Sequence, residues 1–212
     1  MSGTAEEIAA ALLDADALLV RPEAPFRLTS GLRAPFYINC RLILSRPRAR
    51  ALAAAALAAT VPMPATTVIA GGVTAGVPFA TLVAERLGLP LVYVRAEAKA
   101  HGTAGRIEGG AVAGERVHLI EDLISTAGSI LAFTRTLREA GAAVDGVSVL
   151  FSRASESAQV ALEEAGLAFT AVCDLDTLLQ VALVEGRIDE AALGEVRAFL
   201  ADPEGWSAAH DS

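Results

Sequence analysis

A buried strand, a pair of acids and a loop of small residues follow one another in one stretch of this chain. The stretch reads Val117-His118-Leu119-Ile120-Glu121-Asp122-Leu123-Ile124-Ser125-Thr126-Ala127-Gly128-Ser129. A loop of small and hydroxyl residues before a helix N-terminus can turn backbone N–H groups toward a phosphate. Carboxylates such as Glu121 and Asp122 suit sugar hydroxyls or a magnesium ion. The stretch therefore predicts a site for a phosphorylated sugar, and the open alternative is a generic strand-to-helix turn with acids beside it.

Strands alternate with helices on both sides of this stretch. Helices are expected at 5–15 (capped by Thr4), 47–60, 78–87, 129–140, 156–164, 177–185 and 188–200, and strands at 67–70, 90–94, 116–120, 144–151 and 168–173. Residues 26–39 are expected to form a hairpin or extended segments, and 98–110 a long loop or flap. The alternation predicts an α/β fold, with a parallel sheet flanked by helices, in a single domain over 1–212.

The carboxyl ends of the predicted strands are the expected place for a ligand. In open parallel sheets, ligands bind outside those ends, at a switch in strand order. The Gly71 loop, the Arg95 segment and the Glu121 loop each come directly after a predicted strand. We therefore expect these three segments to meet at one edge of the sheet.

The composition predicts a cytoplasmic protein with a sizeable aliphatic core. Of the 212 residues, 53% are hydrophobic and 5% aromatic, and the net charge is −8. Such a charge argues against nucleic acid as a partner over a broad surface. The sequence has neither an apolar run of membrane-spanning length nor the cationic start of a signal peptide, so no membrane is expected. Cys40 and Cys173 are expected to be buried free thiols.

Two further segments offer contacts for phosphates. The glycine-rich loop 71–76 follows a strand and precedes a helix, so its N–H groups could hold pyrophosphate, although a plain tight turn fits equally well. Arg95, Lys99, His101 and Arg106 fall within a short glycine-containing segment of an acidic chain. They predict a cationic lid over a pyrophosphate leaving group. The alternative is a solvated charged hairpin.

The stretch 117–129 resembles the phosphoribosyl pyrophosphate (PRPP) motif of the type I phosphoribosyltransferases. That motif has apolar strand residues, two acids, two apolar residues, two hydroxyl residues, two small residues and a final Ser or Thr. This chain departs from it at Ala127, where Gly is usual, and at His118 within the strand. The Ala127 departure is expected to be mild if its φ is negative, and His118 is interpreted as a packing residue.

Other segments are similar to the orotate phosphoribosyltransferases in particular. Residues 95–102 with 107–109 resemble their flexible catalytic loop, and 69–80 their pyrophosphate loop. Residues 26–31 and 35–39 with Arg41 resemble the segment that covers the orotate pocket, and 202–206 resemble the ending of one bacterial branch. The resemblance covers nearly the whole chain. It implies a type I phosphoribosyltransferase fold with a flexible catalytic loop and a small hood, contributed mainly by 1–45 and the C-terminal segment.

The resemblance implies a PRPP site built from the acid pair and the loops. It gives the ribose hydroxyls to Glu121 and Asp122, with Mg²⁺ nearby and held mainly by PRPP and water. Catalytic roles are implied for Lys99, His101 and Asp122. Lys99 and His101 would reach the neighbouring subunit's site, which implies a homodimer with loop exchange. The residues implied to contact PRPP are Thr74, Ala75, Arg95, Lys99, His101, Glu121, Asp122, Leu123, Ile124, Ser125, Thr126, Ala127, Gly128 and Ser129.

The resemblance also implies a pocket for orotate. Ser125, Tyr37 and Ile38 would contact the base, and Arg153 would pair with its carboxylate. An arginine–carboxylate fork is strong and geometrically selective. Without the resemblance, an exposed arginine at a strand end would explain Arg153 equally well.

The implied activity is transfer of the 5-phosphoribosyl group from PRPP to orotate, which gives orotidine 5'-monophosphate and pyrophosphate in pyrimidine biosynthesis. Two alternatives remain open: transfer to another base, such as a purine, and a PRPP-binding regulator without catalysis. Thr29, Ala75 and Ala96 stand where many members carry lysine. We therefore expect fewer cationic contacts to pyrophosphate than those members make.

Overall fold

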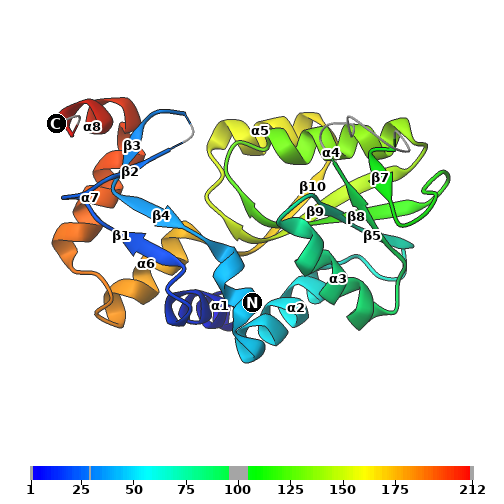
Figure 1. Cartoon of the computed structure of the whole chain (residues 1–212), viewed down its shortest axis with the longest axis horizontal. Coiled ribbons are helices and arrows are strands. Elements are labelled where there is room, and N and C mark those ends of the chain that lie inside the picture. Colours follow the sequence, from blue (N-terminus) through cyan, green and yellow to red (C-terminus); the bar gives the residue numbers. More distant parts are fainter. Residues whose placement is uncertain (1, 29, 96–104, 211–212) are drawn as a thin grey trace. The chain divides into compact units, whose positions relative to one another are not determined.

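The computed structural model describes residues 2–28, 30–95 and 105–210 of the chain (Figure 1). It divides into two compact units, Pro47–Leu175 and Met1–Arg46 with Asp176–Ser212. Each unit is described by itself below, and the organisation of the whole chain as one domain stays a prediction. None of the helices in these ranges is long and apolar enough to cross a membrane.

The unit Pro47–Leu175 is built on a six-stranded sheet with the order β10-β9-β8-β5-β6-β7 (Figure 1). All neighbouring strands are parallel except β7, which is antiparallel to β6 at the edge. This confirms the predicted α/β fold, with a mainly parallel sheet. The strands are β5 (Val68–Gly72), β6 (Leu91–Val94), β7 (Ile107–Glu108), β8 (Arg116–Ile124), β9 (Ala143–Ser152) and β10 (Ala168–Asp174).

Helices cover both faces of this sheet, as the sequence predicts. Helices α2 (Pro47–Thr60) and α3 (Gly76–Leu87) pack on one face, and α4 (Gly128–Glu139) and α5 (Glu156–Glu164) on the other (Figure 1). On the α4 face, Ile130, Phe133 and Leu137 pack into one buried cluster with strand residues such as Leu119 and Val147. Burial of each such side chain stabilises the fold by about 1.5–3 kcal/mol. This buried cluster therefore holds α4 against the sheet.

Two strands run at least two residues beyond the carboxyl ends that the sequence predicts. Strand β5 includes Gly71 and Gly72, and β8 continues through both acids to Ile124 instead of ending at Ile120. The reason is pairing with a long neighbour, because Glu121 lies opposite Val149 and Ile124 opposite Ser152 on β9. Ladder bonds to an adjacent strand outweigh the low strand preference of acids. The acid pair therefore belongs to the rigid sheet and not to the loop.

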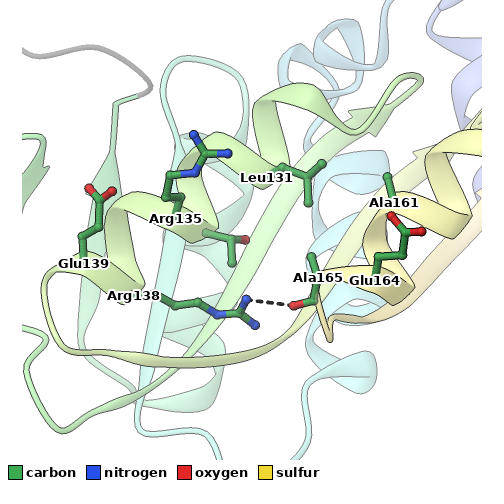
Figure 2. Close-up of a pocket in the computed structure, with 8 residues that line it drawn as sticks. Leu131, Arg135, Arg138, Glu139, Ala161, Glu164 and Ala165 are labelled. Carbon is green, nitrogen blue, oxygen red and sulfur yellow. Dashed lines mark hydrogen bonds between the residues drawn. The ribbon is translucent and has the colours of Figure 1, made fainter.

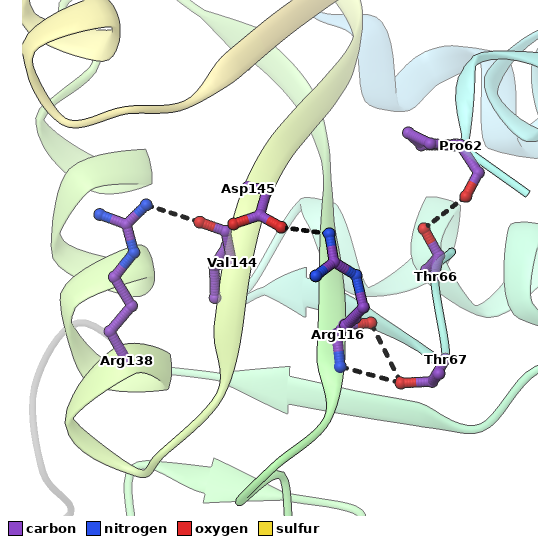
Figure 3. A network of polar contacts seen from close by, with 7 residues as sticks. All are labelled: Pro62, Thr66, Thr67, Arg116, Arg138, Val144 and Asp145. Carbon is purple, nitrogen blue, oxygen red and sulfur yellow. Dashed lines mark hydrogen bonds and ion pairs between the residues drawn. The ribbon is translucent and has the colours of Figure 1, made fainter. Parts of the chain in front are cut away.

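The amino edge of this sheet is tied by polar contacts (Figure 3). Arg116 at the start of β8 pairs with Asp145 of β9 at 2.6 Å. Arg138 of α4 donates to the Val144 carbonyl at 2.6 Å. The Thr67 hydroxyl accepts a hydrogen bond from the Arg116 N–H at 2.9 Å. These contacts link α4, β8, β9 and the start of β5 at the edge opposite the predicted ligand site.

The other unit combines short antiparallel pairs with helices. Its β1 pairs with β4, and β2 pairs with β3, which confirms the hairpin predicted within 26–39. Helix α1 begins at Ser2, so Thr4 lies inside it and does not cap it. The elements are α1 (Ser2–Asp14), β1 (Leu18–Val20), β2 (Phe26–Arg27), β3 (Arg33–Ala34), β4 (Phe36–Ile38), the 3-10 helix η1 (Cys40–Ser45), α6 (Leu175–Val184), α7 (Glu190–Ala201) and α8 (Pro203–Ala209).

Helix α8 is an element that our sequence analysis missed. Asp202 caps it by accepting the Gly205 N–H at 2.9 Å, and Pro203 stands at its start. An Asp–Pro pair is a recognised signal for a helix N-terminus. Trp206 on α8 packs edge-to-face on Phe199 of α7, with ring centroids 5.8 Å apart. This contact fastens the C-terminal segment within its own unit.

Candidate active site

The carboxyl ends of the central strands bring the predicted loops to one edge of the sheet. Gly72 lies opposite Val94 on β6, and Gly71 lies opposite Ile120 on β8. The chain places β6 on one side of β5 and then β8 on the other, so strand order reverses at β5. Such a reversal is where ligands bind in open α/β sheets. The structure therefore puts residues 71–76, the Arg95 segment, and the acid pair with the loop after it where a ligand is expected.

The loop 125–127 leads directly into α4. Ser125 is half-buried, while Thr126, Gly128 and Ser129 are exposed. The first N–H groups of an α-helix have no partner within the helix, so they can bind an anion. The exposed start of α4 therefore offers donors for a phosphate.

Ala127 corrects one expectation from the sequence. Its φ is 60°, in the left-handed region, and its side chain is 4% exposed. The expectation of a mild departure depended on a negative φ, so it does not hold. An L-residue in this region costs about 1–2 kcal/mol relative to an ordinary conformation. The loop thus keeps the left-handed turn that Gly usually makes, but with a buried methyl group at that position.

The two acids of the pair have different surroundings. Asp122 is half-buried, whereas Glu121 is 7% exposed. The Glu121 carboxylate accepts the Asp122 N–H through Oε2 at 3.3 Å. Burial, and secondly the charge of Asp122, raise the pKa of Glu121 to about 8. The prediction that both acids face sugar hydroxyls therefore fits the placement of Asp122 better than that of Glu121.

The glycine-rich loop turns tightly between β5 and α3. Gly71 and Gly72 end the strand, residues 73–75 form the turn, and α3 starts at Gly76. The Val73 N–H donates to the Val94 carbonyl at 2.8 Å, which anchors the turn to β6. Thr74 is exposed and Ala75 half-buried beside the start of α3. Both stand where a pyrophosphate contact is predicted.

Arg95 is held at this edge by an acid. Its guanidinium lies 3.3 Å from Oε1 of Glu108 on β7, and Tyr93 donates to the same carboxylate at 2.7 Å. The Arg95 N–H also donates to the Arg106 carbonyl at 2.9 Å. Glu108 is a partner that our sequence analysis did not identify, although it falls within the loop pattern. Lys99 and His101 lie outside the described residues.

Arg153 lies beside the start of the phosphate loop. It follows β9, is half-buried, and its N–H donates to the Ile124 carbonyl at 3.0 Å. This bond fixes its backbone next to Ser125, the other predicted orotate contact in this unit. Tyr37 and Ile38 lie on β4 of the other unit, where the Tyr37 ring is 5.7 Å from that of Phe26. Their role in orotate binding stays a prediction.

Two other features of this unit lie away from the loops. A groove of about 470 Å³ runs between α4 and α5 (Figure 2), and Arg138 donates to the Ala165 carbonyl beside it at 2.8 Å. On α4 its lining runs from Leu131 to Glu139, and the rest comes from the last turn of α5, so the α4 N-terminus takes no part in it. His118 Nε2 lies 2.8 Å from Oγ of Ser148, and both residues are buried. His118 is therefore a packing residue, as interpreted from the sequence.

Asp122 is the side chain that best fits a metal near the acid pair. Carboxylate oxygens are ligands that Mg²⁺ prefers, and Mg²⁺ usually keeps waters and substrate phosphates as its other ligands. Within the described ranges, no group of three or more His, Cys, Asp or Glu side chains could hold a metal ion. Asp122 could serve as one carboxylate ligand beside a bound phosphate compound.

The family model that matches this chain is that of the phosphoribosyl transferase domain, over residues 48–162. This range contains the glycine-rich loop, the acid pair and the phosphate loop, and it lies within the unit that carries the sheet. The chain therefore belongs to the phosphoribosyltransferase family.

Relatives of the whole chain narrow the family to one branch. An orotate phosphoribosyltransferase of Levilactobacillus brevis is 42% identical over 204 residues, which cover 95% of this chain and 97% of that protein. The crystal structure of orotate phosphoribosyltransferase from Aeropyrum pernix matches with a TM-score of 0.74 at 32% identity, over 86% of this chain and 99% of that one. The crystal structure of the Mycobacterium tuberculosis orotate phosphoribosyltransferase in complex with PRPP matches with a TM-score of 0.65 at 27% identity, over 82% of this chain and 98% of that one. The branch is that of the orotate phosphoribosyltransferases.

Proposed function

We propose that this protein transfers the 5-phosphoribosyl group from PRPP to orotate, giving orotidine 5'-monophosphate and pyrophosphate in pyrimidine biosynthesis. The observation that carries the proposal is the backbone hydrogen bond from Arg153 to Ile124, which fixes the backbone of a cationic residue beside the start of the phosphate loop. A carboxylate-bearing base needs such a cation, whereas a purine does not. Similarity to orotate phosphoribosyltransferases along 95% of the chain supports the same substrate.

The mechanism follows from where charge develops. As the bond from the anomeric carbon to pyrophosphate breaks, the transition state takes on oxocarbenium character. The base nitrogen, which loses its proton to solvent, forms the new bond to that carbon. The N–H groups at the start of α4 would hold the 5-phosphate, and Glu121 and Asp122 would hold the ribose hydroxyls. Arg95, Lys99 and His101 would stabilise the negative charge that grows on the leaving pyrophosphate. No covalent nucleophile is needed, because preorganised charges lower the barrier directly.

Magnesium and a second subunit complete the proposal. Mg²⁺ would bind mainly to PRPP and water, with Asp122 nearby, and would neutralise part of the phosphate charge. Lys99 and His101 would act in the site of the neighbouring subunit of a homodimer. We further propose a cytoplasmic location, without nucleic-acid or membrane partners.

A steady-state assay tests the substrate. With PRPP and Mg²⁺ present, we expect turnover of orotate and none of adenine, hypoxanthine or xanthine. Turnover of a purine instead of orotate would identify a different transferase. If calorimetry detected PRPP binding but no base was consumed, the protein would be a PRPP-binding regulator and the proposal would be wrong.

The orotate pocket is tested at Arg153. Arg153→Ala should raise the KM for orotate about 10- to 100-fold, because a charge-assisted hydrogen bond is worth about 1.5–3 kcal/mol. The KM for PRPP should change much less. Arg116→Ala is a matched control, since Arg116 pairs with Asp145 at the amino edge of the same sheet. An unchanged KM for orotate in Arg153→Ala would exclude the proposed carboxylate contact.

A further inference from the structure

We propose that Arg106 is a positioning residue that fastens the residue before β7 to α4 and thereby fixes the backbone of Arg95, and is not itself a ligand of pyrophosphate. The inference rests on the proposed function, in which Arg95 stabilises the charge on the leaving pyrophosphate. It departs from the sequence analysis, which counted Arg106 among the cations of a lid. The positive charge near pyrophosphate is then left to Arg95, Lys99 and His101.

The guanidinium of Arg106 is bonded to a buried hydroxyl of α4. Its Nη1 donates to Oγ1 of Thr136 at 3.2 Å. The Thr136 hydroxyl donates its own proton to the Ala132 carbonyl at 3.1 Å, one turn back in the helix. With that proton used, the hydroxyl oxygen acts as an acceptor for the cation. Thr136 is 5% exposed, so this contact joins a solvent-facing side chain to a fixed point in the core.

A carboxylate of the same helix lies beside this contact. Oε2 of Glu139 is 4.0 Å from the same Nη1 of Arg106. Glu139 stands three residues after Thr136, so both groups share one face of α4. The two side chains of the ion pair are 43% and 58% exposed, so the pair by itself adds little stability. Together, the hydroxyl and the carboxylate direct the guanidinium toward the helix, and pyrophosphate would have to displace both to bind it.

The backbone of Arg106 carries this anchor to Arg95. The Arg106 carbonyl accepts the Arg95 N–H at 2.9 Å, next to the pairing of Val94 with Ile107. An Arg106 side chain fixed on α4 therefore also fixes the backbone from which Arg95 extends. The start of α4 is the proposed site of the 5-phosphate, and Thr136 lies about 12 Å further along the helix, at 1.5 Å per residue. One rigid helix would thus hold the donors for the 5-phosphate and, through Arg106, the cation for the leaving group.

A double-mutant cycle separates positioning from direct contact. Arg106→Met keeps the aliphatic stem but loses the guanidinium, and Thr136→Val loses the acceptor at a residue that meets no substrate in the proposal. We expect each variant to lower kcat and the affinity for pyrophosphate about three- to tenfold, and the double variant to lower them no further. The KM for orotate and the melting temperature should change little. Thr136→Ser keeps the hydroxyl, so it should match wild type.

Arg135→Met is the matched control, because it removes the same charge from an exposed position of the same helix, on the groove between α4 and α5. It should leave kcat and the affinity for pyrophosphate at their wild-type values. A loss in Arg106→Met without a loss in Thr136→Val would mean that Arg106 contacts pyrophosphate directly, and it would overturn the inference. Losses that multiply in the double variant, or no loss in either single variant, would do the same.

The remaining outcomes concern stability and turnover. A lower melting temperature together with a changed KM for orotate would mean that the contact only supports the fold, which also contradicts the inference. Calorimetric titration with pyrophosphate and Mg²⁺ measures affinity without turnover. If the wild-type protein did not convert orotate, the proposed function would fail, while the titrations would still decide the role of Arg106.

Discussion

Ala127 holds a buried methyl group in a left-handed turn, at φ 60°, immediately before α4. Ala127→Gly would remove a backbone strain of about 1–2 kcal/mol. It would also lose about 0.8 kcal/mol from burial of the methyl group, and the larger conformational entropy of glycine in the unfolded chain would cost about 0.4–1 kcal/mol of stability. We therefore expect its free energy of unfolding to stay within about 1 kcal/mol of wild type. Ala127→Val should lose at least about 1 kcal/mol, because a β-branched residue fits this region poorly. Urea denaturation at neutral pH measures both, and a valine variant as stable as wild type would contradict the argument.

His118 makes stability depend on pH. Burial lowers its pKa from 6.5 to about 4, while in the unfolded chain it titrates near 6.5. Between these values the unfolded state binds more protons, so stability falls as pH falls from about 6.5 to about 4. The loss should reach at most about 3 kcal/mol. Urea denaturation from pH 8 to pH 4.5 should show a flatter profile for His118→Asn than for wild type, and equal slopes would refute the assignment.

At the scale of elements, the pairing of β6 with β7 places the carboxylate of Glu108 beside the guanidinium of Arg95. Glu108→Gln removes the negative charge beside this guanidinium but keeps a group of the same shape for Tyr93. Because pyrophosphate would no longer compete with a carboxylate, its inhibition constant should fall about two- to fivefold. Glu115→Gln is a charge-matched control, since Glu115 bonds Thr67 at the opposite edge of the sheet. A weaker inhibition by pyrophosphate would mean that Glu108 orients Arg95 for the ligand.

The sequence predicts elements well where hydrophobic periodicity is strong and caps are standard. Helices α2 and α5 begin and end at the predicted residues. The sequence cannot show how far a neighbouring strand extends the ladder, so β8 runs four residues further than predicted, through Glu121 and Asp122 to Ile124. The sign of φ at Ala127 is likewise invisible, because alanine usually avoids the left-handed region and only the packed turn imposes it.

Much of the candidate site could be predicted because its residues lie at or just after the carboxyl ends of strands that share one edge. That rule places Arg95, Asp122 and Arg153 at this edge, where the structure has them, without any knowledge of side-chain direction. It does not tell which of two adjacent acids is buried and which is only half-buried. The burial of Glu121 beneath Gly72 depends on contacts between β5, α3 and α4, and such contacts have no signature in a single sequence.

At the scale of the whole molecule, loop exchange predicts complementation between two inactive variants. Lys99→Ala removes a group that each subunit would lend to its neighbour, and Arg153→Ala removes one that each keeps for itself. A mixed dimer would then hold one site with both defects and one with neither. The purified mixed dimer should therefore show about half of wild-type turnover. Co-expression with two affinity tags and assay of the doubly purified dimer measures this, with each variant alone as the reference.

Failure to recover any turnover in the mixed dimer would place Lys99 in its own subunit's site. A quaternary state other than a dimer in light scattering would contradict the proposed homodimer directly.

The net charge of −8 adds a separate expectation about salt, since PRPP and orotate are both anions. Attraction must come from local arginines and lysines, so turnover at low substrate should fall as salt screens those few contacts.

The antiparallel β6–β7 pair has a consequence for engineering this enzyme. The hydrogen bond from Arg95 to the Arg106 carbonyl joins two residues that are eleven positions apart in the sequence, so the sheet itself holds both ends of the segment between them. Each doubling of the length of a closed loop costs only about 0.6 kcal/mol of stability. Residues could therefore be inserted between Arg95 and Arg106 with little loss of stability, and the length of the segment becomes a variable that can be changed to alter turnover while the fold stays the same.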